Sequence, residues 1–435
     1  MFRARTSAIL GILLMLTSAS TQLSARELEL SVGQRLGWDS NALRVANEDD
    51  DRDKDRDGFW EFLPGLTLRE ARNDELSYTL RYRPRYRHYF DVNGINGWDH
   101  TQLARVGWQM TPRDTLSLEQ TYTDTRTRRL EGGDADVDPS DRDRVKRARV
   151  DSAYTHAFTP RVSGQLGFNF EDYQFDSRDR IDNWAAGGSV GTNYAFHERT
   201  ILGLTFFGRY RKNRGDGKFP QRVGGGTQPS SKNYLANLAA SVSQAITPTI
   251  DLFFQIGPSI IHTDPDGTPT DENQITSDGS QTDVSFFTTS SLVKRFRLGE
   301  LRGSYNRTES GGAGAIASQI RDAVDLEAMY RPYPDWTLRL IYQWSQQDVA
   351  QDLKFFSPTS NDFVSADERL RRNRALVILD HRFTDNISAY VRFDYTDQRQ
   401  KEPRRAGAEI KSTTNQVQIY SGFVGVEYTF DPWVF

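Results

Sequence analysis

The chain has 435 residues, of which 37% are hydrophobic, 12% aromatic and 26% charged, and its formal net charge is −4. This apolar fraction is too low for a large compact core, whereas the aromatic content is too high for a disordered protein. The absence of cysteine excludes disulfides, thiolate metal sites and cysteine nucleophiles. The nearly balanced charge gives no reason to expect nucleic acid as a partner.

Residues 1–25 have the layout of a secretory signal peptide. Two arginines precede an apolar run from Ala8 to Leu16, and small polar residues follow. The apolar run is far shorter than the roughly 20 residues of a membrane-spanning helix. We therefore predict an exported protein, cleaved after Ala19 or Ala25, with residues 26–435 as the mature barrel described below.

Beyond the signal peptide, apolar and polar residues alternate, most strictly over residues 76–90. There, leucine and tyrosine occupy even positions, whereas Arg81, Arg83, Arg85 and Arg87 occupy odd positions. A period of two predicts a strand with one apolar and one polar face. The full series of predicted strands begins near residues 28, 60, 76, 102, 116, 147, 162, 184, 202, 234, 250, 284, 301, 320, 336, 374, 387 and 416.

The connections between these strands alternate between short turns and long polar loops. Short turns are predicted at residues 72–74, 111–114, 159–161, 197–199, 247–249, 297–300, 332–335 and 384–386. Loops rich in glycine, aspartate and serine are predicted at residues 39–58, 124–146, 213–231, 264–282, 348–370 and 397–413. Short periplasmic turns and long extracellular loops are typical of a bacterial outer-membrane barrel.

The polar face distinguishes such a barrel from a soluble β-sandwich. Arginines in the middle of a sheet need an aqueous lumen, and the aromatic face can then lie against lipid. Because lipid permits no open strand edges, the sheet must close. We therefore predict an all-β fold, a single closed antiparallel transmembrane β-barrel of about 18 strands, in contact with outer-membrane lipid and lipopolysaccharide. Pro64, Pro84 and Pro258 fall inside predicted strands, and each is expected at a bulge or beyond the bilayer rim.

Barrels of about 16–18 strands enclose an aqueous lumen, so the polar faces are predicted to line a pore. The predicted pore-lining residues are Arg81, Arg83, Arg85, Arg87, Arg105, Glu119, Arg209, Arg211, Arg339 and Arg392. Two roles are open for these charges. Opposite charges on neighbouring strands can neutralise each other and stiffen the wall. Alternatively, the arginines can guide anions and sugars, because guanidinium groups hydrogen-bond carboxylates and stack on rings.

The chain ends in an alternating segment that resembles the C-terminal strand signal recognised by barrel-assembly machinery. That machinery is therefore an expected partner, and Tyr428, Phe430 and the terminal Phe435 are the predicted recognition residues. Asp431 and Pro432 interrupt the alternation, so the recognised strand is expected to stop near Phe430.

Asp53, Asp55 and Asp57 lie in an Asp-x-Asp-x-Asp-Gly pattern that matches the first half of a calcium loop. Pro64 stands where the bidentate glutamate of such a loop should be, so the motif is incomplete. We interpret the run as solvated charges neutralised by adjacent arginines and lysine. Cation bridges from these aspartates to lipopolysaccharide phosphates are a lesser alternative, and neither a metal nor a cofactor is predicted.

The sequence also lacks the motifs of the common hydrolases. None of its six histidines lies in a Gly-x-Ser-x-Gly or His-Glu-x-x-His pattern. We interpret the histidines as polar rim residues and predict no enzyme activity.

Three segments near the start of the mature chain resemble the β-barrel porin 2 family. The first, residues 32–41, ends in Gly-Trp-Asp-Ser-Asn, and the second, residues 63–69, begins with Leu-Pro-Gly-Leu. The third is residues 76–82, and repeated Thr-Pro-Arg turns follow further along the chain. The resemblance covers essentially the whole mature chain. It implies an outer-membrane barrel without a defined catalytic set. A turn-forming role also explains the residues that match the family motif, which are Gly37, Asp39, Ser40 and Asn41.

Members of that family are often encoded beside exopolysaccharide synthesis and export genes, so the resemblance implies a glycan conduit and polysaccharide-export proteins as partners. The first function predicted is thus a passive channel for export of an anionic or neutral exopolysaccharide. A general diffusion or small-anion porin is one alternative. A non-conducting structural or adhesive barrel, plugged by its long loops, is the other.

Overall fold

The computed structural model describes residues 26–42, 56–72, 75–92, 95–125, 144–176, 182–214, 230–266, 280–310, 319–349, 353–357, 362–366, 369–406 and 409–434. The predicted signal peptide, residues 1–25, lies outside these ranges. Within them every regular element is a β-strand, and no helix is long and apolar enough to cross a membrane.

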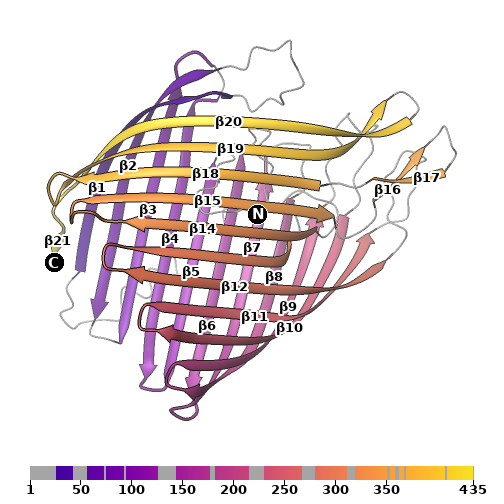
Figure 1. Cartoon of the computed structure of the whole chain (residues 1–435), viewed down its shortest axis with the longest axis horizontal. Helices are drawn as coiled ribbons and strands as arrows, with labels where there is room; N and C mark the ends of the chain where they lie inside the picture. Colours follow the sequence, from indigo (N-terminus) through magenta and orange to yellow (C-terminus); the bar gives the residue numbers. More distant parts are fainter. Residues whose placement is uncertain are drawn as a thin grey trace, which may run out of the picture.

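The main sheet contains 19 strands, and because β21 (Trp433–Val434) has only two residues, 18 strands form the wall (Figure 1). The first half of the wall consists of β1 (Arg26–Asp39), β2 (Asp57–Arg72), β3 (Leu76–Tyr89), β4 (Gly97–Thr111), β5 (Asp114–Thr125), β6 (Val145–Ala157), β7 (Val162–Phe175), β8 (Asp182–His197) and β9 (Thr200–Arg214). The second half consists of β10 (Ser230–Thr247), β11 (Ile250–Asp266), β12 (Gln281–Phe296), β13 (Gly299–Ser310), β14 (Gln319–Tyr330), β15 (Trp336–Val349), β18 (Arg369–Arg382), β19 (Ile387–Ala406) and β20 (Glu409–Thr429).

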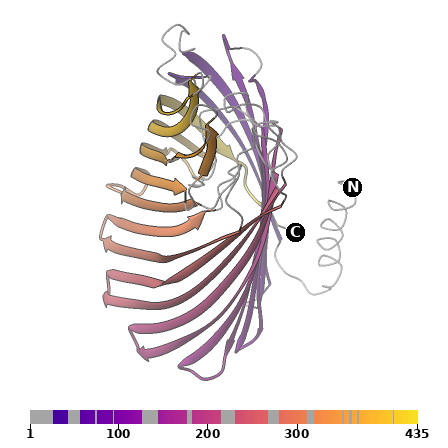
Figure 2. The same cartoon turned by 90° about the vertical axis from the view of Figure 1, so that its right-hand side faces the viewer.

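The sheet closes on itself, as predicted. Each wall strand pairs antiparallel with the next, and β1 pairs with β20 from Ser31↔Thr429 to Asp39↔Ser421. In Figure 1 the early strands, indigo to magenta, cross behind the late strands, orange to yellow, and Figure 2 shows both walls from the side. A separate hairpin, β16 (Leu353–Ser357) and β17 (Asp362–Ala366), lies in the connection between β15 and β18.

The strand predictions are confirmed, since each predicted start falls within a different wall strand. The predicted loop at residues 397–413 is wrong, because β19 and β20 continue as a paired ladder to Ala406↔Glu409. Residues 397–406 are almost entirely polar. A half-buried strand is recognised from alternating apolar and polar residues, and that pattern is absent from this segment.

The prolines also differ from the prediction. No register shift occurs at any of the three, so none lies at a bulge. Instead, the ladder between β2 and β3 is interrupted at residues 63–65 and 83–85, with the same register on both sides. The ladder between β10 and β11 is likewise interrupted beside Pro258. A proline lacks the N–H that a ladder bond requires, so the sheet keeps its register and loses bonds locally.

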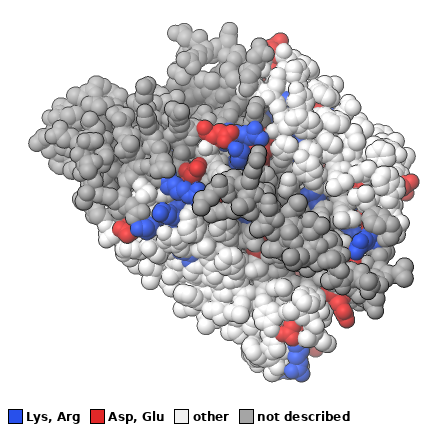
Figure 3. Space-filling view, turned by 180° about the vertical axis from the view of Figure 1, so that it is seen from behind, with Lys and Arg blue, Asp and Glu red and all other residues white. Residues whose placement is uncertain are grey.

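The outward face of the barrel is apolar. Its large exposed side chains include Leu36, Phe206, Leu340 and Val424, which are 61%, 48%, 44% and 54% exposed. In Figure 3 most of the described surface is white, with charged side chains in small, separate groups. A water-soluble protein does not expose so much contiguous apolar surface, so this face lies against lipid.

Aromatic residues mark both borders of the apolar face. Near the loop end of the barrel, the rings of Trp184, Tyr210 and Tyr234 follow one another across three strands at 5.2 Å centroid separations. At the turn end, Phe158 packs against His156 at 4.7 Å and Phe430 against Tyr428 at 4.8 Å. Aromatic girdles at both interfaces are typical of outer-membrane barrels.

The distance between these girdles fits a bilayer. On β8, Trp184 lies in the loop-end girdle, and Tyr194, 43% exposed, lies near the turn end. Ten residues of strand span about 33 Å, or about 23 Å across the membrane at a tilt of about 45°. The apolar band of an outer-membrane barrel is about 25 Å tall. The protein is therefore located in the bacterial outer membrane.

Candidate functional site

The four arginines of β3 share one face of the strand and differ in their partners. The alternate residues Tyr82 and Tyr86 belong to the lipid face, so the arginines face the lumen. Arg85 and Arg87 form ion pairs. Arg81 and Arg83 have no carboxylate within ion-pair distance among the described residues, and the Nε atom of Arg81 is buried without a hydrogen-bond partner. The strand thus combines two neutralised guanidinium groups with two that are not neutralised.

Glu61 is the centre of the neutralised group. It lies on β2 directly opposite Arg35 of β1 and Arg87 of β3, and its side chain is fully buried. Arg87 donates a hydrogen bond from Nε to Oε1 of Glu61 at 2.6 Å, and Arg35 lies 3.5 Å from the other oxygen. Arg85 lies 3.8 Å from Glu61 and 2.8 Å from Asp99 of β4. The cluster therefore holds three cations with two carboxylates.

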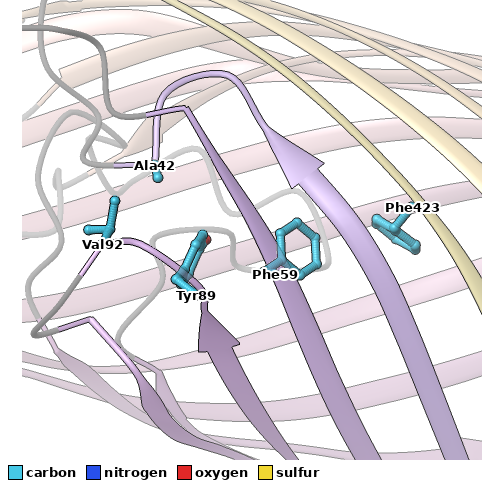
Figure 4. Packing of buried hydrophobic residues seen from close by; sticks show 5 residues of the cluster. All are labelled: Ala42, Phe59, Tyr89, Val92 and Phe423. Carbon is cyan, nitrogen blue, oxygen red and sulfur yellow. The ribbon is translucent and has the colours of Figure 1, made fainter.

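Aromatic rings cover this cluster toward the loop end of the barrel. Phe59, Tyr89 and Phe423 are buried together with Ala42 and Val92, which lie just beyond β1 and β3 (Figure 4). The guanidinium carbon of Arg87 lies 4.8 Å from the ring centroid of Phe59, and that of Arg35 lies 5.0 Å from that of Phe423. Such cation–π contacts stabilise charges that have left bulk water.

A recess of about 610 Å³ opens into the lumen beside this cluster. Most of its walls come from β1–β6, and Tyr390 and Glu427 complete it from β19 and β20. Its charged lining residues are Arg35, Arg81, Arg83, Arg85, Arg147, Arg149, Asp99, Glu119, Asp151 and Glu427. Glu61 and Glu171 lie behind this lining and pair with Arg35 and Arg147. Among the described residues, Arg81 and Arg83 are the lining arginines without a carboxylate within ion-pair distance, so the part of the recess beside them favours anions.

The recess is otherwise lined by hydroxyl groups and by a small apolar patch. Thr101, Thr121 and Thr123 supply hydroxyls from β4 and β5. Leu63 and Leu103 also line it, although they occupy luminal positions that are mainly polar elsewhere in the wall. The recess is therefore amphipathic, with guanidinium and hydroxyl groups around an apolar patch.

The structure places the remaining predicted residues around the whole wall instead of in one site. Most of them are neutralised locally. Arg105 lies 2.6 Å from Glu119, Arg209 2.5 Å from Glu171, and Arg392 3.3 Å from Asp394. Arg339 lies 3.4 Å from Asp380, and Arg211 is buried on β9. These pairs favour the wall-stiffening role for most of the charges, and a role in conduction stays a prediction for every predicted residue.

The weak metal candidate is only partly described. Asp53 and Asp55 lie outside the described residues. Asp57 is buried, and its Oδ2 atom accepts hydrogen bonds from the backbone N–H groups of Asp91 and Val92 at 3.0 and 2.8 Å. The part of the chain that the structure describes contains no group of three or more side chains suited to hold a metal ion. Asp57 therefore fastens the end of β3 to the start of β2.

The residues that match the family motif form the end of β1 and the start of the turn that follows it. Ser40 donates its N–H to the carbonyl of Tyr420 and accepts the N–H of Tyr420 on its hydroxyl, both at 2.9 Å. Asp39 accepts the N–H of Asn41 at 3.1 Å. A Cβ on Gly37 would lie 2.7 Å from the Cβ of Phe423, so only glycine fits there. These contacts close a turn against β20.

At the C-terminus, β20 ends at Thr429, and Phe430 donates its N–H to the carbonyl of Leu30 at 2.9 Å. After Asp431 and Pro432, β21 resumes pairing with β1 at Leu28↔Trp433. Phe435 lies outside the described residues. Recognition of this segment by assembly machinery stays a prediction.

Reasoning from the sequence missed the acidic partners Glu61 and Asp99 and the apolar patch of Leu63 and Leu103. One available signal could have found the first of these. Counting outward from the short turn after Arg72, Glu61 falls opposite Arg87. Register was therefore readable at this hairpin, because a short turn fixes the pairing on both of its strands.

No protein-family model and no curated protein matches this chain. Among solved structures, it is similar to the ferric-catecholate import receptor Fiu from E. coli K12, with 9% identity and a TM-score of 0.44 over 92% of this chain and 81% of that one. It is also similar to the FrpB iron transporter from Neisseria meningitidis, with 9% identity and a TM-score of 0.43 over 92% and 82%. The siderophore receptor PirA from Pseudomonas aeruginosa gives 10% identity and 0.40 over 92% and 80%. Nothing about cargo follows from likenesses at this level.

Proposed function

We propose that the protein is a passive outer-membrane channel that exports an anionic or neutral exopolysaccharide. The observation that carries the proposal is the luminal recess. There, Arg81 and Arg83 have no carboxylate partner within the described part of the chain, and threonine hydroxyls lie nearby. Unneutralised guanidinium groups hydrogen-bond carboxylates and hydroxyls and stack on rings. A wall built only for mechanical strength gains nothing from leaving these two cations unpaired.

The polymer itself is supported by the resemblance to the β-barrel porin 2 family, and the recess supports only its chemical class. Polysaccharides offer repeated hydroxyl and carboxylate groups, which bind weakly at each sugar and strongly in series. A passive conduit needs that weak, repeated binding, because tight binding at one point would hold the cargo in the pore. Polysaccharide-export proteins are the partners that such a conduit would meet.

A small-anion porin is the second candidate, favoured by the same two arginines, Arg81 and Arg83. The two candidates differ in the size of the cargo. A polymer that enters the lumen displaces ions and interrupts the current, whereas a small anion carries it. The third candidate, a non-conducting barrel, predicts no current.

The test is single-channel recording of the purified full chain in a planar bilayer. We expect open-channel conductance, and reversible blocks when an acidic polysaccharide such as alginate is added on the periplasmic side. Replacing Arg81 and Arg83 by glutamine should shorten the blocks about tenfold, since two charge-assisted contacts are lost. The control replaces Arg302 and Arg339, which already pair with Glu300 and Asp380, and should leave block duration unchanged.

Conductance without polymer block would contradict export of a polysaccharide, and the small-anion porin would then be the better candidate. Absence of any conductance from correctly folded protein would contradict both channel functions.

A further inference from the structure

The hydrogen-bond ladder of the wall is interrupted where Pro64 and Pro84 face each other, and this interruption is called the β2–β3 gap below. Pro64 pairs with Val32 of β1, and Pro84 pairs with His100 of β4. The β1–β2 and β3–β4 ladders are therefore continuous past the two prolines. The ladder bond that each proline cannot donate therefore lies on the side that faces the other proline. Two prolines at opposite positions remove both hydrogen bonds of that pair, and the β2–β3 ladder accordingly has no bridge at residues 63–65 and 83–85.

This β2–β3 gap lies at a defined depth of the membrane. Pro84 is two residues from Tyr86, whose ring packs against Trp98 at 5.3 Å in the girdle at the loop end. Two residues of strand span about 6.6 Å, so the gap lies in the outer leaflet, just inside the headgroup region. Backbone groups without partners cost several kcal/mol in hydrocarbon, so a break at this depth calls for an explanation.

The recess lies directly behind the gap. Both prolines line it, together with Leu63 and Gly65 from β2. Leu103 of β4 also faces the lumen and lines the recess. A hydrocarbon chain that entered the recess would therefore meet apolar side chains. Arg81 and Arg83, which have no carboxylate partner among the described residues, lie beside them. A molecule held here would contact cations in the lumen, leucines in the wall and lipid outside.

We propose that the β2–β3 gap and the recess behind it bind an amphiphile with a phosphate headgroup. The headgroup lies on Arg81 and Arg83, and the hydrocarbon chain passes between Pro64 and Pro84 into the outer leaflet. The two strands can part at this point without breaking a hydrogen bond, because both bonds are already missing. This inference does not rest on the proposed export of a polysaccharide.

Two alternatives explain the site less well. A soluble anion accounts for Arg81 and Arg83 but leaves the leucines and the opposed prolines without a role. A purely structural break accounts for the prolines but not for unpaired arginines behind them. The interruption at Pro258 supports this contrast, because it contains one proline instead of two, and Pro258 does not line the recess.

The experiment uses photo-crosslinking of the full chain in phosphatidylcholine vesicles. Benzoylphenylalanine is placed at Leu63 or, separately, at Leu103. The vesicles contain either fluorescent phosphatidic acid or diacylglycerol with the same acyl chains. We expect a phosphatidic acid adduct at both luminal positions and at least about tenfold less diacylglycerol adduct, since only phosphatidic acid carries the anion. Leu340, on the lipid face, should label both lipids equally, and luminal Ile341 should label neither.

Two double variants test the parts of the site, with the probe kept at Leu103. Replacing Arg81 and Arg83 by glutamine should reduce the phosphatidic acid adduct about tenfold, whereas the control variant with Arg302 and Arg339 replaced should not. Replacing Pro64 and Pro84 by valine restores both N–H groups and should abolish the adduct. The control Pro258→Val restores the other interruption and should leave the adduct unchanged.

Equal labelling by both lipids, or an adduct unaffected by both double variants, would overturn the proposal. If inorganic phosphate protects Arg81 and Arg83 from phenylglyoxal but no lipid adduct forms, the site binds a soluble anion and the proposal is wrong. Channel conductance and polysaccharide block are measured on the same preparations. Normal conductance and polysaccharide block without a lipid adduct would contradict only this inference, and a lipid adduct without conductance would contradict only the proposed function.

Discussion

Glu61 shows how a single side chain can decide whether a cluster is stable. It is the closest carboxylate to Arg87 and also lies within 4 Å of Arg35 and Arg85. The side chain of Glu61 is 0% exposed, whereas that of Glu119, the partner of Arg105, is 40% exposed. Removing one partner of a buried pair leaves an uncompensated buried charge, and removing a partner of an exposed pair costs little.

We expect Glu61→Gln to destabilise the barrel by about 3–5 kcal/mol. The matched substitution Glu119→Gln should cost at most about 1 kcal/mol. Urea titration of vesicle-reconstituted protein, followed by tryptophan fluorescence, measures both. Equal effects of the two substitutions would show that burial of Glu61 does not decide its contribution.

Gly37 and Gly33 lie on the same face of β1 and differ in the space beside them. A Cβ at Gly37 would come within 2.7 Å of Phe423, whereas the nearest atom to a Cβ at Gly33 is 3.4 Å away. We therefore expect Gly37→Ala to cost about 1–3 kcal/mol through overpacking of the aromatic cluster, and Gly33→Ala to be tolerated. The same urea titration is the measurement, and a tolerated Gly37→Ala would contradict the close packing of this cluster.

At the scale of elements, prediction from the sequence depends on whether a strand has two different faces. Where lipid lies on one side and water on the other, as at Leu76–Tyr89, alternation of residue types locates the strand directly. Residues 397–406 contain almost no apolar residues, so the strand has no such signature and was predicted as a loop. The opposed prolines were not recognised as a gap, because each was considered on its own strand. The register that places Glu61 opposite Arg87 also places Pro64 opposite Pro84.

The recess was beyond sequence reasoning for a related reason. It combines residues from β1–β6 with Tyr390 of β19 and Glu427 of β20. Only barrel closure places β20 beside β1, with β19 on the far side of β20. The arginines of β3 were predictable as luminal residues from their alternation with tyrosine. Which of them are neutralised depends on cross-strand partners, such as Asp99 opposite Arg85.

The alternating connections predict which segments are accessible from outside the cell. A protease site inserted into residues 213–231 or 264–282 should be cleaved on intact cells, because long loops of outer-membrane barrels face outward. The same insertion at residues 247–249, between β10 and β11, should be cleaved only after the outer membrane is permeabilised. Reversed accessibility would contradict the predicted orientation of the barrel in the membrane.

For the whole molecule, the apolar exterior requires a lipid or detergent environment. We expect the protein to fold only in micelles or vesicles, with circular dichroism dominated by β-structure. Unboiled samples should migrate differently from boiled ones in gel electrophoresis, because a closed ladder has no frayed edge where the detergent can begin unfolding. A soluble, helix-rich monomer would contradict the architecture.

Closure between β1 and β20 has a consequence for biosynthesis. The bonds that join Ser40 to Tyr420 connect residues 380 positions apart. The segment of β1 is therefore synthesised early but cannot form its pairing with β20 until nearly the whole chain has been synthesised. A nascent chain that stops early presents a bare β1 edge, which bilayers do not accept and proteases readily attack. Unfinished copies therefore never acquire the inserted state, and the seam between the two ends acts as a check that translation ran to completion.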